Sequence, residues 1–261
     1  MVFYIFIFIL GSIIGSFINC LSWRLAHNQK VTLERSECPK CKSKLKWWEN
    51  FPIFSFLFLK GRCRYCKVKI PIDYLLTELA GGLLFVAVFY FNGAIQTLDT
   101  IKILFEFFIV SVLLFIFLHD ILYKEILSGA IWLSVVVTLV YQFFKGVYPA
   151  TGGASIWNIL VGGILGFSFF AFQYFISKGK WIGGGDVRLG LLLGLLLGWE
   201  KTIVALLFAY WLGALVGLFL IFSKKSKMNS EIPFGTFLVV GTLVALYFGK
   251  YIINWYSNII G

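Results

Sequence analysis

The chain has 261 residues, of which 60% are hydrophobic and 19% aromatic, while only 13% are charged. A composition this apolar excludes a soluble globular protein, and it also excludes an intrinsically disordered chain, which carries more charge and fewer aromatic residues. The 5 prolines and 26 glycines fit neither a collagen nor a low-complexity pattern. The composition therefore predicts a protein that crosses a membrane several times.

Apolar runs follow one another along the chain, and a membrane helix needs about 20 apolar residues. They predict an all-α fold with about eight transmembrane helices. The runs lie at residues 2–21, 75–91, 101–118, 127–144, 156–176, 187–199, 203–222 and 234–253. The sixth run is short, so we expect it to be partly re-entrant or sheltered by its neighbours. The first run lacks a preceding basic segment and a small-residue cleavage site, which favours a permanent helix over a signal peptide.

Basic residues gather on one side of these spans. Of the 23 Lys and Arg residues, 19 fall in the segments on one side of an eight-span protein and 4 on the other. By the positive-inside rule the basic side is cytoplasmic, which predicts a multi-pass protein of the cytoplasmic (inner) membrane with both termini outside. A basic rim attracts anionic lipid headgroups, and it explains the net charge of +11 without a nucleic-acid partner.

The most polar segment follows the first apolar run, and its position suggests that the chain has three parts. We expect residues 1–24 to be the first membrane helix, residues 25–73 a small cytoplasmic insert, and residues 74–261 a bundle of membrane helices. An insert of about fifty residues buries little apolar surface, so it needs an additional source of stability. Its neighbouring tryptophans, Trp47 and Trp48, would either anchor it at the membrane interface or form its core.

Four of the five cysteines lie in the insert as two C-x-x-C pairs, Cys38 with Cys41 and Cys63 with Cys66. Two such pairs supply four thiolates to one tetrahedral zinc ion and leave no position for a substrate, as in structural zinc sites. Disulfides are the alternative, but a reducing cytoplasm disfavours them. Cys20, within the first run, is expected to be a small buried apolar residue without a further role.

Acidic residues at the ends of apolar runs are functional candidates, because charge inside a membrane is costly. Asp120 follows the third run, and Asp186 opens the sixth run after three glycines, both at the cytoplasmic side. Two carboxylates at one depth can share a proton, so that one accepts a proton from water while its protonated partner polarises a scissile carbonyl. Gly183 and Gly185 would let an extended substrate approach closely. The pair predicts aspartic peptide hydrolysis.

Structural roles are the alternative for each acidic residue. Either aspartate could cap a helix or pair with a nearby Lys124, Lys180 or Arg188. Glu78, just inside the second span, is expected to be either a supporting residue or an interfacial charge. Glu106 is expected to pair with Lys102, one helical turn before it.

A set of motifs in a fixed order carries a resemblance to a known family. The set comprises Gly15–Asn19 leading to Arg24, the two cysteine pairs, Trp47-Trp48-Glu49-Asn50 with Pro52, Tyr74 with Glu78, Asp120, Gly183–Asp186 and Ile232–Gly235. With these motifs the chain resembles the type IV prepilin peptidases over nearly its whole length. The resemblance implies a GxGD-type intramembrane aspartic protease whose catalytic residues are Asp120 and Asp186. It also implies cleavage of the basic leader of prepilins or pseudopilins at the cytoplasmic face, and in many members N-methylation of the new terminus with S-adenosylmethionine.

Two positions depart from the family pattern. Leu127 and Ser128 follow Ile126 where the family usually has proline and then Asp or Asn, and His119 precedes the first aspartate where an apolar residue is more common. Neither departure touches the carboxylates. No glycine-rich nucleotide-binding turn follows a predicted strand, so the sequence does not locate a site for S-adenosylmethionine.

Other functions remain open at the level of sequence. The aspartates could bind a cation in a transporter, or they could be structural in an assembly scaffold with a regulatory zinc insert. For a peptidase, the basic face would not attract a basic leader, so local carboxylates must meet it. We expect Glu49 and Glu78 to bind or support the substrate, with Asp73 and Glu125 also within reach.

Overall fold

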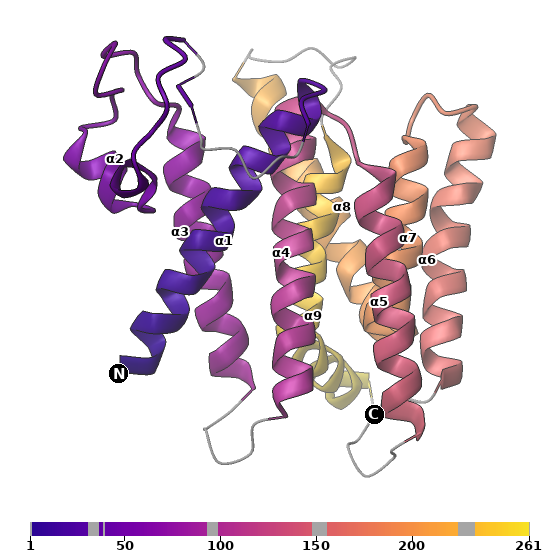
Figure 1. The fold of residues 1–261 in the computed structure, drawn as a ribbon. Coiled ribbons are helices and arrows are strands. Elements are labelled where there is room, and N and C mark those ends of the chain that lie inside the picture. Colours follow the sequence, from indigo (N-terminus) through magenta and orange to yellow (C-terminus); the bar gives the residue numbers. More distant parts are fainter. Residues whose placement is uncertain are drawn as a thin grey trace. The chain divides into compact units, whose positions relative to one another are not determined.

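The computed structural model describes residues 2–30, 37–38, 40–92, 99–147, 156–223 and 233–260. Their helices are α1 (Val2–Ala26), η1 (Trp47–Asn50), α2 (Phe54–Phe58), α3 (Ile72–Phe91), α4 (Thr100–Tyr123), α5 (Ser128–Val147), α6 (Ile156–Ser177), α7 (Gly184–Leu197), α8 (Trp199–Phe222) and α9 (Phe234–Ile260) (Figure 1). A helix of 14 to 27 residues lies at each of the eight predicted apolar runs, and the described residues form isolated β-bridges but no strand. The predicted all-α fold is confirmed.

Six helices of the described part are long and apolar enough to cross a membrane, namely α1, α3, α4, α6, α8 and α9. Helix α5 contains a shorter apolar segment, Ser128–Phe144. Helix α7 has 14 residues, which span about 21 Å at 1.5 Å per residue and fall short of the roughly 30 Å of a bilayer core. The sixth predicted span is therefore short in the structure, as its apolar run indicated.

Gly198 joins α7 directly to α8. Its φ of 75° lies in the left-handed region, which a glycine adopts at little cost. The break leaves the first amide of α8 without a helical partner, and Trp199 N–H donates instead to Asn158 Oδ1 of α6, at 3.2 Å. A helix start within the hydrocarbon region would need such a partner, because water does not reach its unpaired amides there.

The chain forms two compact units, residues 1–118 and residues 119–261. In the first unit, α1 and α3 pack against each other, and the insert lies beyond the end of α1 and the start of α3 (Figure 1). The two helices meet through glycines: a Cβ atom on Gly81 would lie 2.5 Å from the carbonyl oxygen of Gly11. Small residues allow this close approach, which drives helix packing in lipid.

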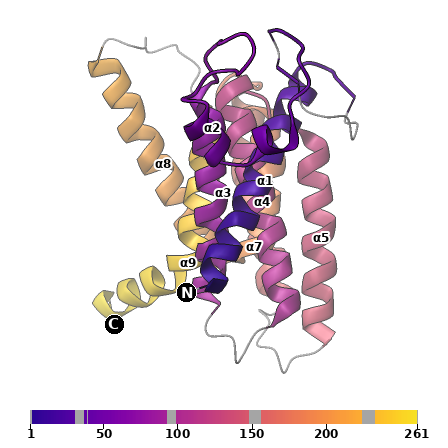
Figure 2. The same ribbon diagram turned by 60° about the vertical axis from the view of Figure 1, so that its left-hand side comes forward.

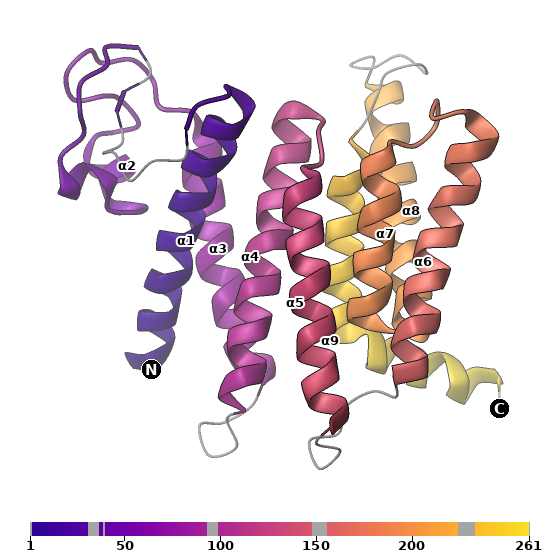
Figure 3. The same cartoon turned by 45° about the vertical axis from the view of Figure 1, so that its right-hand side comes forward.

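The second unit contains the last turn of α4 and helices α5 to α9. Helices α6 and α7 run side by side (Figure 3). Helix α9 packs along α8, and its last turns bend away from its first part (Figure 2).

Glycines set the register of α6 against α7. Gly162 meets Gly194, and Gly166, four residues later in α6, meets Gly190, four residues earlier in α7, at distances that leave no room for a Cβ atom. Because the two helices are antiparallel, this pairing places the first turn of α7 beside the C-terminal half of α6. Asp186 lies in that first turn.

Candidate functional site

The two cysteine pairs of the insert adopt the same local structure. In the first, Cys38 N–H donates to Ser43 O at 3.0 Å, and Cys38 O accepts the N–H of Lys42 at 2.8 Å; equivalent bonds occur around Cys63. Lys42 and Lys67 occupy matching left-handed positions, with φ of 56° and 58°. Each pair is thus a tight turn that points both of its sulfur atoms the same way.

The four sulfur atoms converge on one point. All lie within 4.8 Å of one another, and Cys38 Sγ lies 3.8 Å from Cys66 Sγ. Tetrahedral Zn–S bonds of about 2.3 Å place sulfur atoms about 3.8 Å apart, so this cluster fits one zinc ion. All five cysteines, including Cys20, are free thiols rather than disulfides.

Hydrogen bonds favour the thiolate form of two ligands. The side chain and backbone of Ser43 lower the pKa of Cys41 to about 6, with the hydroxyl 3.2 Å from the sulfur. The backbone amide of Cys66 lowers the pKa of Cys63 in the same way. Thiolates are the form that binds a metal.

Glu49 is buried inside the insert. Its Oε2 accepts the N–H of Lys46 at 2.8 Å, and its Oε1 lies 3.6 Å from the guanidinium of Arg64, which belongs to the second cysteine pair. Oε1 accepts no hydrogen bond, so Arg64 stabilises the negative charge on this oxygen by electrostatic attraction alone. Glu49 therefore links the segment between the cysteine pairs to the second pair. It lines an open pocket of about 410 Å³ together with Trp48 and with Phe54 and Phe58 of α2.

Glu78 connects the insert to a membrane helix. It projects from α3, is buried, and its Oε2 accepts the N–H of Ile53 at 2.7 Å; the side chain of Ser16 on α1 also hydrogen-bonds to it. Ile53 has a φ of 65°, which is unfavourable for a β-branched residue. The hydrogen bond that the Ile53 N–H donates to Glu78 stabilises this turn immediately before α2.

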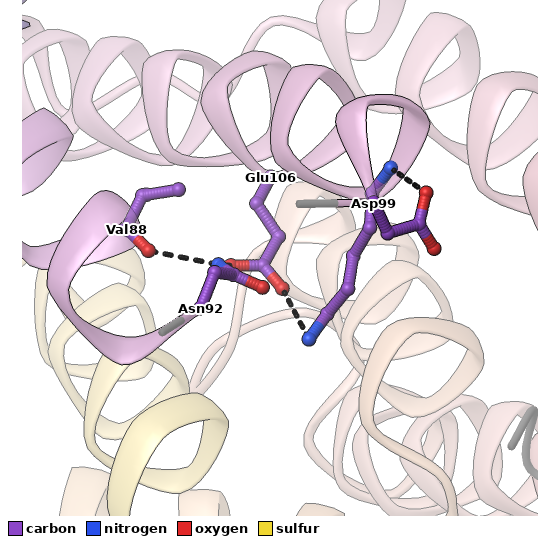
Figure 4. Close-up of polar contacts among 5 residues, drawn as sticks. Val88, Asn92, Asp99 and Glu106 are labelled. Carbon is purple, nitrogen blue, oxygen red and sulfur yellow. Dashed lines mark hydrogen bonds and ion pairs between the residues drawn. The ribbon is translucent and has the colours of Figure 1, made fainter. Parts of the chain in front are cut away.

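Glu106 has the structural role that its spacing indicated. Its Oε1 lies 3.8 Å from Lys102 Nζ on the same helix, and its Oε2 accepts a hydrogen bond of 2.7 Å from Asn92 at the end of α3 (Figure 4). The predicted pairing with Lys102 is confirmed. Glu106 joins α3 to α4 within the first unit.

Asp120 and Asp186 both belong to the second unit and are both buried, at 4% and 7% relative exposure. Asp120 lies in the last turn of α4, and its Oδ2 accepts the N–H of Thr236 from the first turn of α9, at 2.8 Å. Asp186 lies in the first turn of α7, and its Oδ2 accepts the N–H of Gly183 at 3.2 Å. Each carboxylate is thus held through one oxygen by one backbone amide.

The remaining oxygen of Asp186 is buried and has no hydrogen-bond partner. The two aspartates lie near each other within this unit, because Gly235, which contacts Asp120, and Gly185, which precedes Asp186, both pack against Ile126. A buried carboxyl oxygen without a partner is costly unless it carries or receives a proton. The arrangement can therefore hold one proton between two carboxylates and present it to a water or a carbonyl group.

Ile126 packs between the elements that carry the carboxylates. A Cβ atom on Gly185 would lie 2.8 Å from Ile126 Cβ, and a Cβ on Gly235 would lie 2.8 Å from Ile126 Cδ1. The glycines were expected to admit a substrate; in the structure Gly185 also makes room for Ile126, and Gly183 supplies an amide to Asp186. Arg188, an alternative partner for the aspartates, donates a hydrogen bond to Ser128.

The sequence did not indicate that the start of α9 contributes to this site. Gly235 was noted only within a motif, and Thr236 was not singled out. No local signal could have revealed the contact, because 116 positions separate Thr236 from Asp120.

His119 is almost completely buried, at 1% exposure, and its ring lies 4.9 Å from that of Tyr123.

Comparison with known proteins bears on the whole chain. The family model described as "Bacterial Peptidase A24 N-terminal domain" matches residues 9–91, and the one described as "Type IV leader peptidase family" matches residues 107–218. Three relatives are named prepilin leader peptidase/N-methyltransferase. They come from Aeromonas salmonicida strain A449 (32% identical over 88% of this chain and 77% of the relative), Legionella pneumophila (31%, 86% and 76%) and Bacillus subtilis strain 168 (28%, 96% and 96%). No solved structure matches the chain. With these matches and its membrane-spanning helices, this multi-pass membrane protein belongs to the type IV leader peptidase family.

Proposed function

We propose that this protein is an intramembrane aspartic endopeptidase that removes the short basic leader of type IV prepilins or pseudopilins. The observation that carries the proposal is the buried pair Asp120 and Asp186, each fixed through Oδ2 by a backbone amide, with Asp186 Oδ1 lacking a partner. The family of the chain and the names of its relatives supply the substrate class.

In this reaction Asp120 and Asp186 act as a pair that shares one proton. The ionised carboxylate accepts a proton from water as the water oxygen attacks the scissile carbonyl carbon, and the protonated carboxyl donates a hydrogen bond to the carbonyl oxygen. The proton taken from water then passes to the leaving amide nitrogen as the C–N bond breaks. Two proton-transfer groups of the same residue type suffice, because their mutual repulsion keeps one of them protonated.

The other predicted residues support this pair. Gly183, just before α7, and Gly185, in its first turn, are the positions at which an extended peptide would approach Asp186. Glu49 and Glu78 are supporting residues that order the insert, and they are the candidates for contact with the basic leader. The insert, residues 25–73, acts as a small part distinct from the membrane helices of residues 74–261.

Cys38, Cys41, Cys63 and Cys66 would hold a structural zinc ion. The sulfur separations and the hydrogen bonds that favour thiolates support this assignment. Four protein ligands fill a tetrahedral shell, so the metal would stabilise the insert and take no part in hydrolysis.

The same protein is proposed to methylate the new N-terminus with S-adenosylmethionine as methyl donor, since its relatives are named as N-methyltransferases as well. We place the insert and the cleavage site at the cytoplasmic face of the inner membrane, with both termini outside, from the distribution of Lys and Arg. Membrane lipid surrounds the helices, and nucleic acid is not a partner.

The test is incubation of the detergent-purified protein with a prepilin, followed by mass spectrometry of the product. We expect loss of the basic leader immediately before the hydrophobic helix, and a gain of one methyl group on the new N-terminus when S-adenosylmethionine is added. An intact prepilin after incubation with folded, zinc-loaded protein would contradict the peptidase. A transporter or scaffold predicts the same negative result, and retained turnover of prepilin by an Asp186→Ala variant would likewise contradict the aspartic-peptidase assignment.

A further inference from the structure

We propose that Gly235 and Thr236, at the start of α9, are positioning residues for Asp120. The inference rests on the proposed peptidase activity and adds a third helix to the site of Asp120 and Asp186. It assigns a task to the Pro233–Thr236 segment, which the catalytic pair alone leaves unexplained.

The contact uses the backbone of Thr236. Its N–H donates to Asp120 Oδ2 at 2.8 Å, and both groups are buried. Its hydroxyl is engaged elsewhere, because it donates to the carbonyl of Pro233 at 2.7 Å. The amides of a first helical turn have no partner within their own helix, so Asp120 satisfies one of them from a distant helix.

Gly235 provides the room for this contact. A Cβ atom at this position would lie 2.8 Å from Asp120 Oδ2 and 2.8 Å from Ile126 Cδ1. Non-bonded atoms do not approach so closely, so any side chain at position 235 must displace the carboxylate or Ile126. The tight fit fixes the carboxylate from the side opposite its own helix.

A backbone amide also holds the partner carboxylate, Asp186. Gly183 N–H holds Asp186 Oδ2 just as Thr236 N–H holds Asp120 Oδ2. Each Oδ2 already accepts an amide hydrogen bond, so we assign proton exchange between the pair to the Oδ1 atoms, and Asp186 Oδ1 is buried without a hydrogen-bond partner. Displacement of Asp120 would therefore change the geometry of proton transfer and leave the apolar binding of the substrate helix intact.

The first experiment is a kinetic comparison of Gly235→Ala with Gly129→Ala, since a Cβ atom on Gly129 has nothing within 4 Å. We expect Gly235→Ala to lower kcat for prepilin cleavage by about 100-fold with KM nearly unchanged. Displacing a catalytic group by about 1 Å lowers the rate of the chemical step by about this factor. Gly129→Ala should retain normal kcat. Normal kcat in Gly235→Ala would overturn the proposal.

Two further variants separate the contacts at this position. In Gly235→Ala combined with Ile126→Val, the Cδ1 atom is removed, so recovery of kcat would assign the effect to Ile126 and overturn the role of Asp120. Thr236→Val keeps the backbone N–H and removes the hydroxyl, and we expect it to retain kcat within a few-fold. A loss as large as that of Gly235→Ala would show that the hydroxyl, not the amide, is the important group.

A measurement that does not depend on peptidase activity tests the contact even if Gly235→Ala does not fold. Hydrogen exchange at the Thr236 amide should accelerate about tenfold in Asp120→Ala, because that amide loses its acceptor, and should be unchanged in Asp186→Ala. Equal exchange in wild type and Asp120→Ala would overturn the positioning contact. This readout does not depend on peptidase activity, so a failure of the proposed function and a failure of this inference are distinguishable.

Discussion

Thr236 N–H and Asp120 Oδ2 form a buried hydrogen bond of 2.8 Å between helices whose contacting residues are 116 positions apart. This bond joins the end of α4 to the start of α9. Asp186 lies at the start of α7, so all three helix ends must lie on one side of the second unit. From this side, α5 leads the chain to the opposite side of the unit and α6 leads it back. Helices α7 and α8 do the same.

The purified protein should contain about one zinc ion per chain. Cys63→Ser should remove the metal and make the insert sensitive to protease, because ligand binding and folding are coupled in so small a segment. Elemental analysis and limited proteolysis measure both effects. Cys20→Ser is the matched control and should alter neither. Metal-free, freshly reduced protein with a protease-resistant insert would contradict the assignment.

Removal of the Glu78 carboxylate should loosen the insert. In Glu78→Ala the Ile53 N–H loses its acceptor in an unfavourable left-handed turn, at a cost of about 1–3 kcal/mol. Glu78→Gln retains an acceptor oxygen and should keep most of the stability. Limited proteolysis of the insert distinguishes the two variants, and equal resistance of Glu78→Ala and wild type would contradict the structural role.

The proposed contact between these carboxylates and the leader has its own test. Glu49→Gln and Glu78→Gln remove the charge but keep the shape, so KM for prepilin should rise in at least one of them if the carboxylates meet the basic leader. Changes in ionic strength should affect KM little, because binding is mostly apolar. A normal KM in both variants would restrict Glu49 and Glu78 to ordering the insert.

Close packing of α6 against α7 should be necessary for activity. A Cβ atom on Gly194 would overlap the backbone of Gly162, so Gly194→Ala should destabilise the protein by about 1–3 kcal/mol and lower cleavage by displacing the helix that carries Asp186. Gly213→Ala is the control, because its nearest neighbour, a ring atom of Phe237, would lie at an ordinary 3.5 Å. Thermal unfolding in detergent measures the difference, and equal stability of the two variants would contradict the packing.

Much of this architecture was predictable because its signals are local. Apolar runs locate membrane helices, and C-x-x-C spacing brings sulfur atoms together, so the helices and the cysteine cluster could be predicted from short segments. The contacts of Glu78 with Ile53 and of Thr236 with Asp120 could not, because each joins the backbone of one segment to a side chain of another. Backbone donors have no sequence signature. The role of Gly235 was hidden for the same reason, since only the folded chain shows which atoms a side chain there would meet.

The most direct test of the central claim is single-turnover cleavage of a prepilin by wild type, Asp120→Asn, Asp186→Asn and the double variant, each shown to be folded and zinc-loaded. Because asparagine keeps the shape but cannot exchange the proton, each single variant should lose at least about 1,000-fold in rate. The double variant should be hardly slower than either single variant, since the two carboxylates act as one unit. Cleavage near the wild-type rate by either single variant would contradict the paired-carboxylate mechanism.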